Sequence, residues 1–475
     1  MKILFAASEA APFIKSGGLG DVLEALPKAL SENDSYDVSV ILPYYRSLKI
    51  NPDFKPEFVT NFYMPLGWRA SYVGVFCLKV KKVTYYFIDN EYYFNRDGGY
   101  YGHYDDGERF AYFSKAVLES LRYINYMPDI IHLNDWQTAC IPVFYKAFYK
   151  NIPEYSHIKT VFTIHNIEYQ GKMPLEFREA TMGLSDEFAG VMEYDGCVNF
   201  MKSAIVLSDR ITTVSETYSH EIMHAYFSHG LDPILRENEY KLTGIVNGIN
   251  EEIFNPKTDK NLARNYSVGN LSGKAACKCA LQSKLGLEIR NDIPIVSMVT
   301  RLVSHKGLDL VERVLPDMLN DNIQFVVVGT GDDKYEEMFR FAEYNYRGKM
   351  AACITFSSSL ASEVYAGSDI FLMPSKSEPC GLSQLIAMRY GTIPVVRETG
   401  GLYDTVPALN PETMDGLGFT FKLFNAHDML DAVRRATSFW HDSNKREKLI
   451  KKLMHRDSSW TEPVKAYANI YEALK

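Results

Sequence analysis

Short apolar runs alternate along the chain with longer segments in which apolar residues recur at helical spacing. The segments 108–123 and 136–149 show this helical spacing and predict amphipathic helices. Strands that alternate with helices are typical of a parallel sheet covered by helices. The apolar runs of the first half are KILFAA (2–7), DVSVIL (37–42), DIIHL (129–133), TVFTI (160–164) and RITTV (210–214).

Two regions interrupt this rhythm. Residues 54–89 contain FVTNFYM, VGVFCLKV and VTYYFI, which predict antiparallel strands inserted into the first domain. Residues 246–292 contain NGINEEIFNP and are polar, as expected of a connector. A second alternating series then follows, with the apolar runs IPIVSMV (293–299), IQFVVVG (323–329), ACITF (352–356), IFLMP (370–374) and TIPVV (392–396).

The pattern therefore predicts two Rossmann-like α/β domains. We place the N-terminal domain at 1–245, the C-terminal domain at 246–455 and an amphipathic C-terminal helix at 456–475. Open parallel sheets bind ligands at the carboxyl ends of their strands, so we expect the two sheets to face an inter-domain cleft.

Composition and charge narrow the function classes. The net charge is −8 and no basic block occurs, which argues against a nucleic-acid partner. The chain contains no run of eighteen apolar residues, so we expect no membrane-spanning helix. Seven cysteines is an odd number without disulfide or zinc spacing, so a reduced cytoplasmic protein is the simplest interpretation.

Candidate chemistry in the first half follows the strands. The stretch KSGGLGDV supplies Lys15, two adjacent glycines and the start of a helix, which together suit an anion. It matches neither the P-loop nor the GxGxxG pattern, and a simple glycine turn explains it equally well. His165 and Asn166 follow TVFTI and suit sugar hydroxyls, although a lone histidine at a strand end more often has a structural role. Asp135 follows DIIHL and suits either a ligand or a helix cap.

In the second half, Arg301 and Lys306 stand at a strand-to-helix junction, where two cations suit a diphosphate. Glu378 lies in a turn after IFLMP, and its carboxylate suits sugar hydroxyls. A second glycine pair, Gly400 and Gly401, follows TIPVV. No cluster of acidic residues or histidines predicts a metal site.

Taken in order, six stretches resemble the motifs of the bacterial glycogen synthase and plant starch synthase family, and the resemblance runs from residue 1 to 475. They are KSGGLGDV, HNIEYQG, GIVNGIN, TRLVSHKGLDL, PSKSEPCGLSQL and ETGGLYDTV. The resemblance implies the GT-B type fold, with the last helix returning to the first domain. It also implies retaining transfer of glucose from ADP-glucose to the non-reducing 4-hydroxyl of an α-1,4-glucan, with no metal or other cofactor.

Residue roles are carried over by motif position. The resemblance assigns Lys15, Arg301 and Lys306 to the phosphates, Glu378 and His165 to glucose, and Asp135 to the acceptor side. These six are the expected catalytic residues. The expected substrate-binding residues are Gly17, Gly18, Asp21, Asn166, Asn247, Phe356, Cys380, Gly381, Leu382, Thr399, Gly400 and Gly401, with Phe356 stacking on the base.

The sequence departs from the usual family pattern at four positions. Gln137 stands where histidine is common, His305 where glutamine is common, Asn250 where aspartate is common and Phe356 where tyrosine is frequent. The lost hydroxyl at Phe356 leaves the donor base open.

Three alternatives follow from the same residues. One is another retaining GT-B glucosyltransferase that uses UDP-glucose, but sucrose-type relatives commonly carry a second glutamate where this chain has Ile386. A dehydrogenase would need the GxGxxG turn, which is absent. The third is a non-catalytic glucan-binding scaffold. This alternative is disfavoured because the chain keeps a charged residue at every charged position of the family motifs, which a scaffold would not need.

Overall fold

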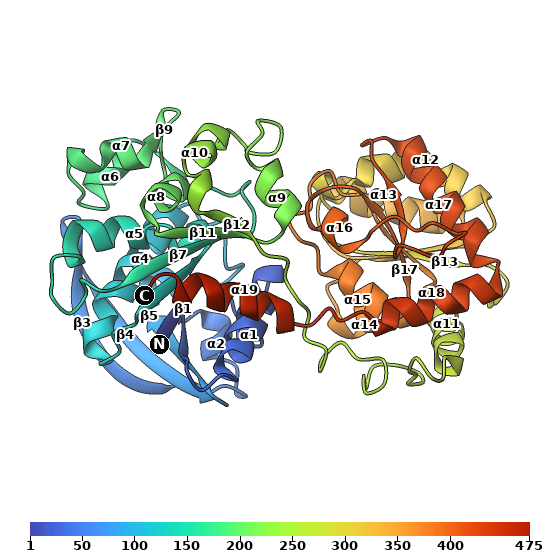
Figure 1. Cartoon of the computed structure of the whole chain (residues 1–475), viewed down its shortest axis with the longest axis horizontal. Helices are drawn as coiled ribbons and strands as arrows, with labels where there is room; N and C mark the ends of the chain where they lie inside the picture. The colour runs from blue at the N-terminus through green and yellow to red at the C-terminus, as the bar shows by residue number, and fades with distance from the viewer. The chain divides into compact units, whose positions relative to one another are not determined.

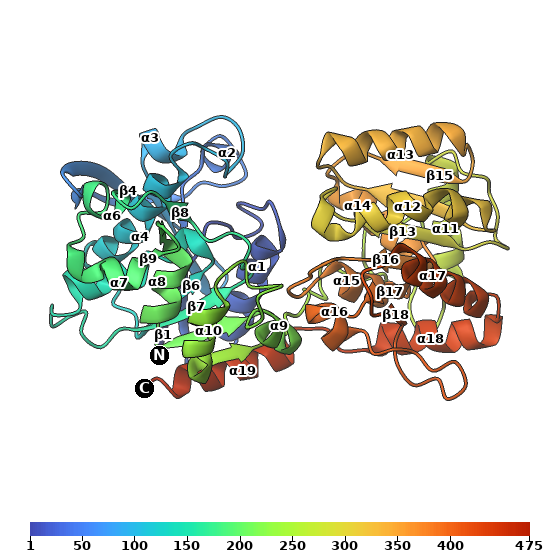
Figure 2. The ribbon, with the colours of Figure 1, turned by 90° about the horizontal axis from the view of Figure 1, so that it is seen from above.

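The computed structural model describes all residues from Met1 to Lys475, and they form two compact α/β units. Unit 1 consists of Met1–Asn247 together with Trp460–Lys475, and unit 2 consists of Gly248–Ser459. The chain thus changes unit a few residues after each boundary expected from the sequence. Figures 1 and 2 show both units from two directions.

Unit 1 is built on a nine-stranded sheet in the order β12-β11-β7-β6-β1-β2-β5-β4-β3. The strands from β12 to β5 pair in parallel, which confirms the predicted Rossmann-like architecture. The strands are β1 (Lys2–Ala6), β2 (Asp37–Pro43), β3 (Glu57–Leu66), β4 (Arg69–Val80), β5 (Val83–Asp89), β6 (Ile130–Asn134), β7 (Lys159–Ile164), β11 (Arg210–Thr213) and β12 (Leu242–Gly244). A separate small sheet contains β8 (Lys172–Met173), β9 (Glu193–Tyr194) and β10 (Cys197–Asn199).

The region 54–89 extends the main sheet instead of forming an insertion of its own. Strands β3 and β4 are antiparallel as expected, but β5 pairs in parallel with β2 on one side and antiparallel with β4 on the other. The predicted antiparallel strands are therefore confirmed, and the parallel pairing of β5 with β2 is an additional feature that joins them to the main sheet. Alternation of apolar residues reports which face of a strand is buried but carries no information on the direction of its neighbour.

Helices cover the parallel part of this sheet. The predicted helix 108–123 is confirmed as the longer α4, but the predicted helix 136–149 is wrong in detail. It is divided into η1 (Trp136–Thr138), α5 (Ile141–Phe144) and the π-helical turn η2 (Tyr145–Tyr149). Pro142 lacks an N–H, so it can begin a helix but cannot continue one that starts at Trp136.

The α-helices of unit 1 are α1 (Gly18–Ser31), α2 (Arg46–Lys49), α3 (Glu91–Phe94), α4 (Asp106–Tyr123), α5, α6 (Phe177–Ala180), α7 (Ala189–Met192), α8 (Phe200–Leu207), α9 (Glu216–Glu221), α10 (Asp232–Glu237) and α19 (Thr461–Glu472). Two further short 3₁₀ turns are η3 (Asp186–Phe188) and η4 (Glu239–Lys241).

Unit 2 is a six-stranded, wholly parallel sheet in the order β15-β14-β13-β16-β17-β18. Its strands are β13 (Ile295–Val299), β14 (Gln324–Val328), β15 (Met350–Cys353), β16 (Ile370–Met373), β17 (Ile393–Arg397) and β18 (Phe419–Phe421). Its helices are α11 (Ser272–Lys284), η5 (Ser304–Lys306), α12 (Leu308–Asn320), α13 (Asp333–Asn345), α14 (Ser358–Gly367), α15 (Ser383–Arg389), α16 (Gly400–Thr405), α17 (Ala426–Trp440) and α18 (Ser443–His455).

Helix α11 lies where the sequence predicted a polar connector. Two of its lysines are buried, so charged residues occupy positions on the inner face of the helix where a helix prediction expects apolar residues. The Lys274 ammonium donates to the carbonyls of Ala366, Ser368 and Tyr390 and to the Thr392 hydroxyl. Because buried polar groups require partners, these contacts make a polar residue acceptable at a core position.

The C-terminal helix α19 belongs to unit 1, as expected, and packs against α1 (Figures 1 and 2). Tyr471 is fully buried, and its hydroxyl lies 2.7 Å from Nδ1 of the buried His132 on β6. Nε2 of His132 lies 2.5 Å from the Thr163 hydroxyl on β7. Burial lowers the pKa of His132 to about 3, so the ring is neutral and relies on these hydrogen bonds.

We predict that Tyr471→Phe destabilises unit 1, because Nδ1 of His132 would be left buried without a partner. Such a loss costs about 1–3 kcal/mol, or roughly 2–10 °C in the midpoint of thermal unfolding for a unit of this size. Differential scanning calorimetry measures it. Tyr36→Phe is the matched control, because it removes an exposed hydroxyl that donates to Glu472 on the same helix at 3.3 Å. Equal shifts for the two variants would contradict the prediction.

Candidate functional site

The loop between β1 and α1 carries the first predicted site residues. Gly17 precedes the first turn of α1 in an extended conformation, and Gly18 is the first helical residue. The Lys15 ammonium is half-exposed and lies 2.7 Å from the Asp21 carboxylate in the first turn of the helix. Burial raises the pKa of the Asp21 carboxyl above its ordinary value, and the charge of Lys15 opposes that shift. Asp21 thus holds Lys15 and makes no side-chain cap.

Glu9 shapes this loop, and sequence reasoning missed it. Its buried carboxylate accepts hydrogen bonds from the Ser16 N–H at 2.5 Å, the Gly17 N–H at 3.2 Å, the Ser16 hydroxyl at 2.6 Å and the Tyr101 hydroxyl at 2.6 Å. The expectation that both glycine amides face a bound donor therefore needs correction. The Gly17 N–H is occupied by Glu9, and the Gly18 N–H is the one that the start of the helix offers to an anion.

Asp135, His165 and Asn166 meet at the ends of the neighbouring strands β6 and β7. One Asp135 oxygen accepts from the His165 N–H at 2.7 Å and from the Asn166 N–H at 3.3 Å. Asp135 has φ 57° and ψ −178°, a strained backbone for a residue with a side chain. Burial raises the pKa of the Asp135 carboxyl to about 7, although both N–H donors lower it, and burial lowers the pKa of His165 to about 3.

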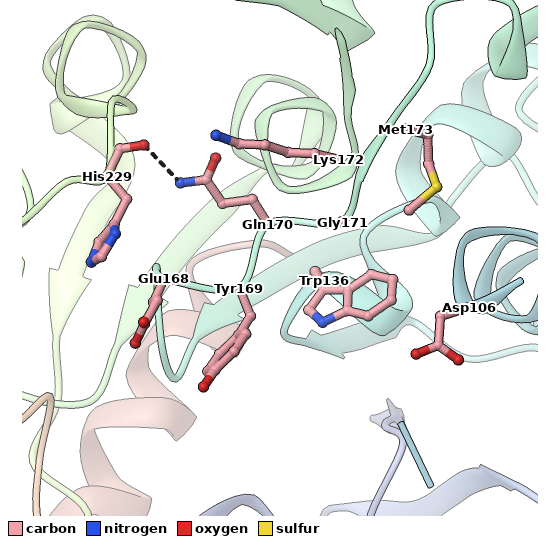
Figure 3. A pocket seen from close by; sticks show the side chains of 9 residues that line it. All are labelled: Asp106, Trp136, Glu168, Tyr169, Gln170, Gly171, Lys172, Met173 and His229. Atoms are coloured by element: carbon pink, nitrogen blue, oxygen red, sulfur yellow. Dashed lines mark hydrogen bonds between the residues drawn. The ribbon is translucent and has the colours of Figure 1, made fainter. Parts of the chain in front are cut away.

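A pocket of about 500 Å³ opens beside this corner. Figure 3 shows Trp136, Tyr169, Asp106 and Glu168 around its space, while the Gln170 amide donates to the His229 carbonyl at its wall. These residues were not predicted from the sequence, although Trp136 and Tyr169 stand two and five residues after the ends of β6 and β7 and were a usable signal. The pocket is lined by Asp106, Trp136, Glu168, Tyr169, Gln170, Gly171, Lys172, Met173 and His229.

In unit 2, a buried ion pair joins the ends of β13 and β16. The Lys306 ammonium contacts both Glu378 oxygens, at 3.0 and 2.7 Å, and the Ser375 hydroxyl donates to one of them at 2.8 Å. Burial raises the pKa of Glu378, but the charge and hydrogen bonds of Lys306 outweigh burial and bring it below its ordinary value. Arg301 is exposed at the end of β13.

The loop 380–382 and the second glycine pair pack against each other. Cys380 is buried, and Gly381 has φ 72°. A Cβ on Gly400 would lie 2.1 Å from the Glu378 carbonyl oxygen, and a Cβ on Gly401 would lie 2.2 Å from that of Cys380. The Gly401 N–H also donates to the Glu378 carbonyl at 3.1 Å. In this structure the glycine pair therefore supports the Glu378 loop, and Thr399 precedes it at the start of α16.

Two predicted residues stand apart from these groups. Asn247 is the last residue of the first segment of unit 1, and its buried side-chain oxygen has no hydrogen-bond partner. Phe356 follows β15 and is 75% exposed.

The structure gathers no group of three or more His, Cys, Asp or Glu side chains that could hold a metal ion. None of its helices is both long enough and apolar enough to span a membrane. All seven cysteines are free thiols.

Each unit has a Rossmann-like sheet with charged side chains after its strand ends, and unit 1 also has the pocket. With the family matches, these features define the class: a glycosyltransferase of the GT-B type. The model of the starch synthase catalytic domain matches residues 2–237, and that of group 1 glycosyl transferases matches residues 283–455.

The chain is 47% identical to a glycogen synthase of Exiguobacterium sibiricum and 48% identical to one of Clostridium acetobutylicum, over its full length and at least 99% of theirs. The solved catalytic domain of starch synthase IV from Arabidopsis thaliana, bound to ADP and acarbose, is 32% identical with a TM-score of 0.90, covering 100% of this chain and 99% of that one. A sucrose-phosphate synthase from Thermosynechococcus elongatus shares the fold alone, with a TM-score of 0.62, 16% identity and coverage of 100% and 98%. The chain therefore belongs to the glycogen synthase and starch synthase family.

We predict that Lys306→Met destabilises unit 2 in a pH-dependent way. In the wild type the depressed pKa of Glu378 gives a stabilisation that is present above the unfolded pKa near 4.5 and is lost as the pH falls below it. In the variant, burial without Lys306 raises the pKa of Glu378, so the penalty appears as the carboxyl ionises. The difference in unfolding midpoint between the two proteins should thus widen from pH 4 to pH 8.

Ser375→Ala is the control, since it removes a hydrogen bond to Glu378 but keeps the charge of Lys306. A midpoint difference that stays constant over this pH range for Lys306→Met would show that the ion pair does not set the protonation of Glu378.

Proposed function

We propose that this protein transfers glucose from ADP-glucose to the non-reducing 4-hydroxyl of an α-1,4-glucan, with retention of configuration. The observation that carries the proposal is the full-length similarity to glycogen synthases together with the charged groups at both sets of strand ends. Unit 1 is assigned the acceptor side and unit 2 the nucleotide sugar. Seven free thiols favour a cytoplasmic protein.

Charge development at the leaving diphosphate is the main catalytic demand. When the bond from sugar C1 to phosphate breaks, negative charge grows on the diphosphate, and preorganised cations stabilise it. We assign this role to Lys15, Arg301 and Lys306. The Lys306 ammonium donates to both oxygens of Glu378. Because an ammonium has three N–H donors, one remains for a phosphate oxygen. Glu378 then both orients Lys306 and accepts from glucose hydroxyls.

Retention requires either two inversions or departure and attack on the same face. A carboxylate nucleophile would be needed for two inversions. Glu9 is committed to four hydrogen-bond donors, and Asp135 holds the backbone of His165 and Asn166. Attack and departure on the same face is therefore the mechanism that these residues favour.

The pocket beside Asp135 suits the acceptor glucan. Trp136 and Tyr169 present aromatic faces, on which the apolar face of a pyranose ring can stack. Asp106 and Glu168 present carboxylates, which accept hydrogen bonds from sugar hydroxyls. The pocket volume of about 500 Å³ falls in the range of small-ligand sites.

We predict that ADP-glucose has a higher kcat/KM than UDP-glucose, because the Lys15 loop belongs to the family branch that uses ADP-glucose and Phe356 can stack on adenine without a hydroxyl. The measurement is transfer of radiolabelled glucose to glycogen from each donor. A higher kcat/KM with UDP-glucose would contradict the assignment of ADP-glucose as the donor but would still support glucose transfer to the glucan. Glycogen binding without transfer from either donor would favour the scaffold alternative.

Replacing Tyr169 should weaken acceptor binding and leave donor binding unchanged. Loss of one stacked ring costs about 1–1.5 kcal/mol, which corresponds to a roughly five- to tenfold rise in KM for a maltooligosaccharide. Initial rates of Tyr169→Ala at varied acceptor and at varied ADP-glucose separate the two constants. Tyr240→Ala is the control, because Tyr240 is 82% exposed and lies outside the pocket lining. A rise in the KM for ADP-glucose alone would contradict the acceptor assignment.

A further inference from the structure

Asn134 joins the carboxyl ends of three strands. It is the last residue of β6, which pairs with β1 on one side and β7 on the other, and it is 2% exposed. Its side-chain Nδ2 donates to the Ala6 carbonyl at 3.1 Å and to the His132 carbonyl at 3.2 Å. Its Oδ1 lies 2.9 Å from Nε2 of His165.

These contacts fix which way the Asn134 amide faces. Rotating the amide by half a turn would place its oxygen against two carbonyl oxygens, a repulsive arrangement without a hydrogen atom between the partners. Oδ1 must therefore face His165, and because Oδ1 can only accept, Nε2 of His165 must carry the hydrogen. The structure gives Nδ1 of His165 no partner within the protein.

We propose that Asn134 is a positioning residue that fixes His165 as the neutral Nε2–H tautomer, so that Nδ1 accepts a hydrogen bond from a hydroxyl of the transferred glucose. This inference deepens the proposed function and rests on it only for the identity of the sugar. It goes beyond the assignment of His165 to the site because it defines which hydrogen-bonding partner the ring can take.

The choice of an amide partner has a chemical consequence. A carboxylate beside a histidine stabilises the imidazolium and raises its pKa, whereas a neutral amide accepts the same hydrogen bond without a charge. An imidazolium would present a second N–H donor and a positive charge to the sugar. Positive charge develops on that sugar when its bond to phosphate breaks, so a neutral ring avoids electrostatic repulsion at that moment.

Other titratable groups near this corner do not replace the role of Asn134. Asp135 accepts from the backbone N–H of His165, His132 on β6 is neutral, and the Tyr218 hydroxyl accepts from the Ile167 N–H. Glu9 on the loop after β1 is held by its own four donors. Asn134 is thus the group that contacts Nε2 of His165 directly.

The tautomer can be observed directly in the wild-type protein by ¹⁵N NMR of histidine side chains, with the His165 signals assigned by their loss in His165→Gln. We expect a protonated Nε2 and an unprotonated Nδ1 between pH 6 and pH 8. A protonated Nδ1 with an unprotonated Nε2, or a doubly protonated ring, would overturn the inference. This measurement requires no substrate.

Asn134→Asp tests the consequence for catalysis. When ionised, the new carboxylate still accepts from Nε2 and raises the pKa of His165, so the ring gains a proton as the pH falls. Its second oxygen takes the place of Nδ2 against the Ala6 and His132 carbonyls, so the ¹³C shift of the new carboxyl group is recorded first to establish the pH range in which it is ionised, and activity is compared within that range. We expect kcat/KM for ADP-glucose to fall about tenfold or more from pH 8 to pH 5.5 relative to the wild type, and the NMR signal of Nδ1 to become protonated over the same range. A variant that loses activity equally at every pH, with an unprotonated Nδ1 throughout, would contradict the proposal.

Asn238→Asp is the matched control. Asn238 is also buried in unit 1 and its Nδ2 donates to the Ile234 carbonyl at 2.8 Å, but it forms no hydrogen bond with a histidine. It should lower stability without adding a pH-dependent step to kcat/KM. The same pH-dependent loss of kcat/KM in this variant would show that any buried aspartate in unit 1 causes it, and would contradict a specific role of Asn134.

Deoxyfluoro analogues of ADP-glucose identify the hydroxyl. Fluorine cannot donate, so the analogue substituted at the contacted position should lose about five- to tenfold more in kcat/KM with wild type than with His165→Ala. If no analogue shows this difference although ADP-glucose is a good donor, the inference fails and the proposed function stands. If ADP-glucose is no donor but the tautomer is as described, the proposed function fails and the role of Asn134 stands.

Discussion

The parallel pairing of β1, β6 and β7 is the constraint on which the unit 1 site depends. It brings three strand ends to one edge, where the sheet hydrogen bonds stop and polar backbone groups need other partners. Asn134 satisfies carbonyls on β1 and β6, Asp135 accepts from the backbone after β7, and Glu9 binds the amides before α1. The same side chains that complete the sheet edge therefore also hold the loop after Lys15 and the His165 ring in place.

The hydrogen bonds that each side chain makes at this sheet edge also determine its chemical character. A carboxylate with every bonding position occupied, such as Glu9, is a structural anchor and a poor nucleophile. A histidine whose inner nitrogen faces an amide, such as His165, is a neutral acceptor. Asp135 lies between these cases, because burial raises the pKa of its carboxyl to about 7 while its backbone is held in a strained conformation. Residue type alone does not define the role of any of these side chains.

Sequence patterns predicted both parallel sheets and placed Lys15, His165, Arg301 and Glu378 at strand ends, because apolar runs and turn residues are local signals. The helix α11 was missed since Lys274 replaces an apolar residue by binding four distant acceptors. Glu9 was missed for a related reason. Its role depends on the Tyr101 hydroxyl, 92 positions away, and no local pattern reports such a contact. Local signals thus define the elements, while long-range polar contacts define the site.

The two lysines at the strand ends differ in how freely they can meet an anion. The pair of Lys15 and Asp21 is partly exposed, and such pairs are worth about 0–1 kcal/mol, so a diphosphate can replace Asp21 at little cost. The pair of Lys306 and Glu378 is largely buried, and removing one partner from such a pair costs about 3–5 kcal/mol. If Lys306 binds a phosphate as proposed, it does so while it keeps Glu378. The Lys15 side chain can therefore exchange its partner at little cost, whereas Lys306 and Glu378 remain together as a fixed element of unit 2.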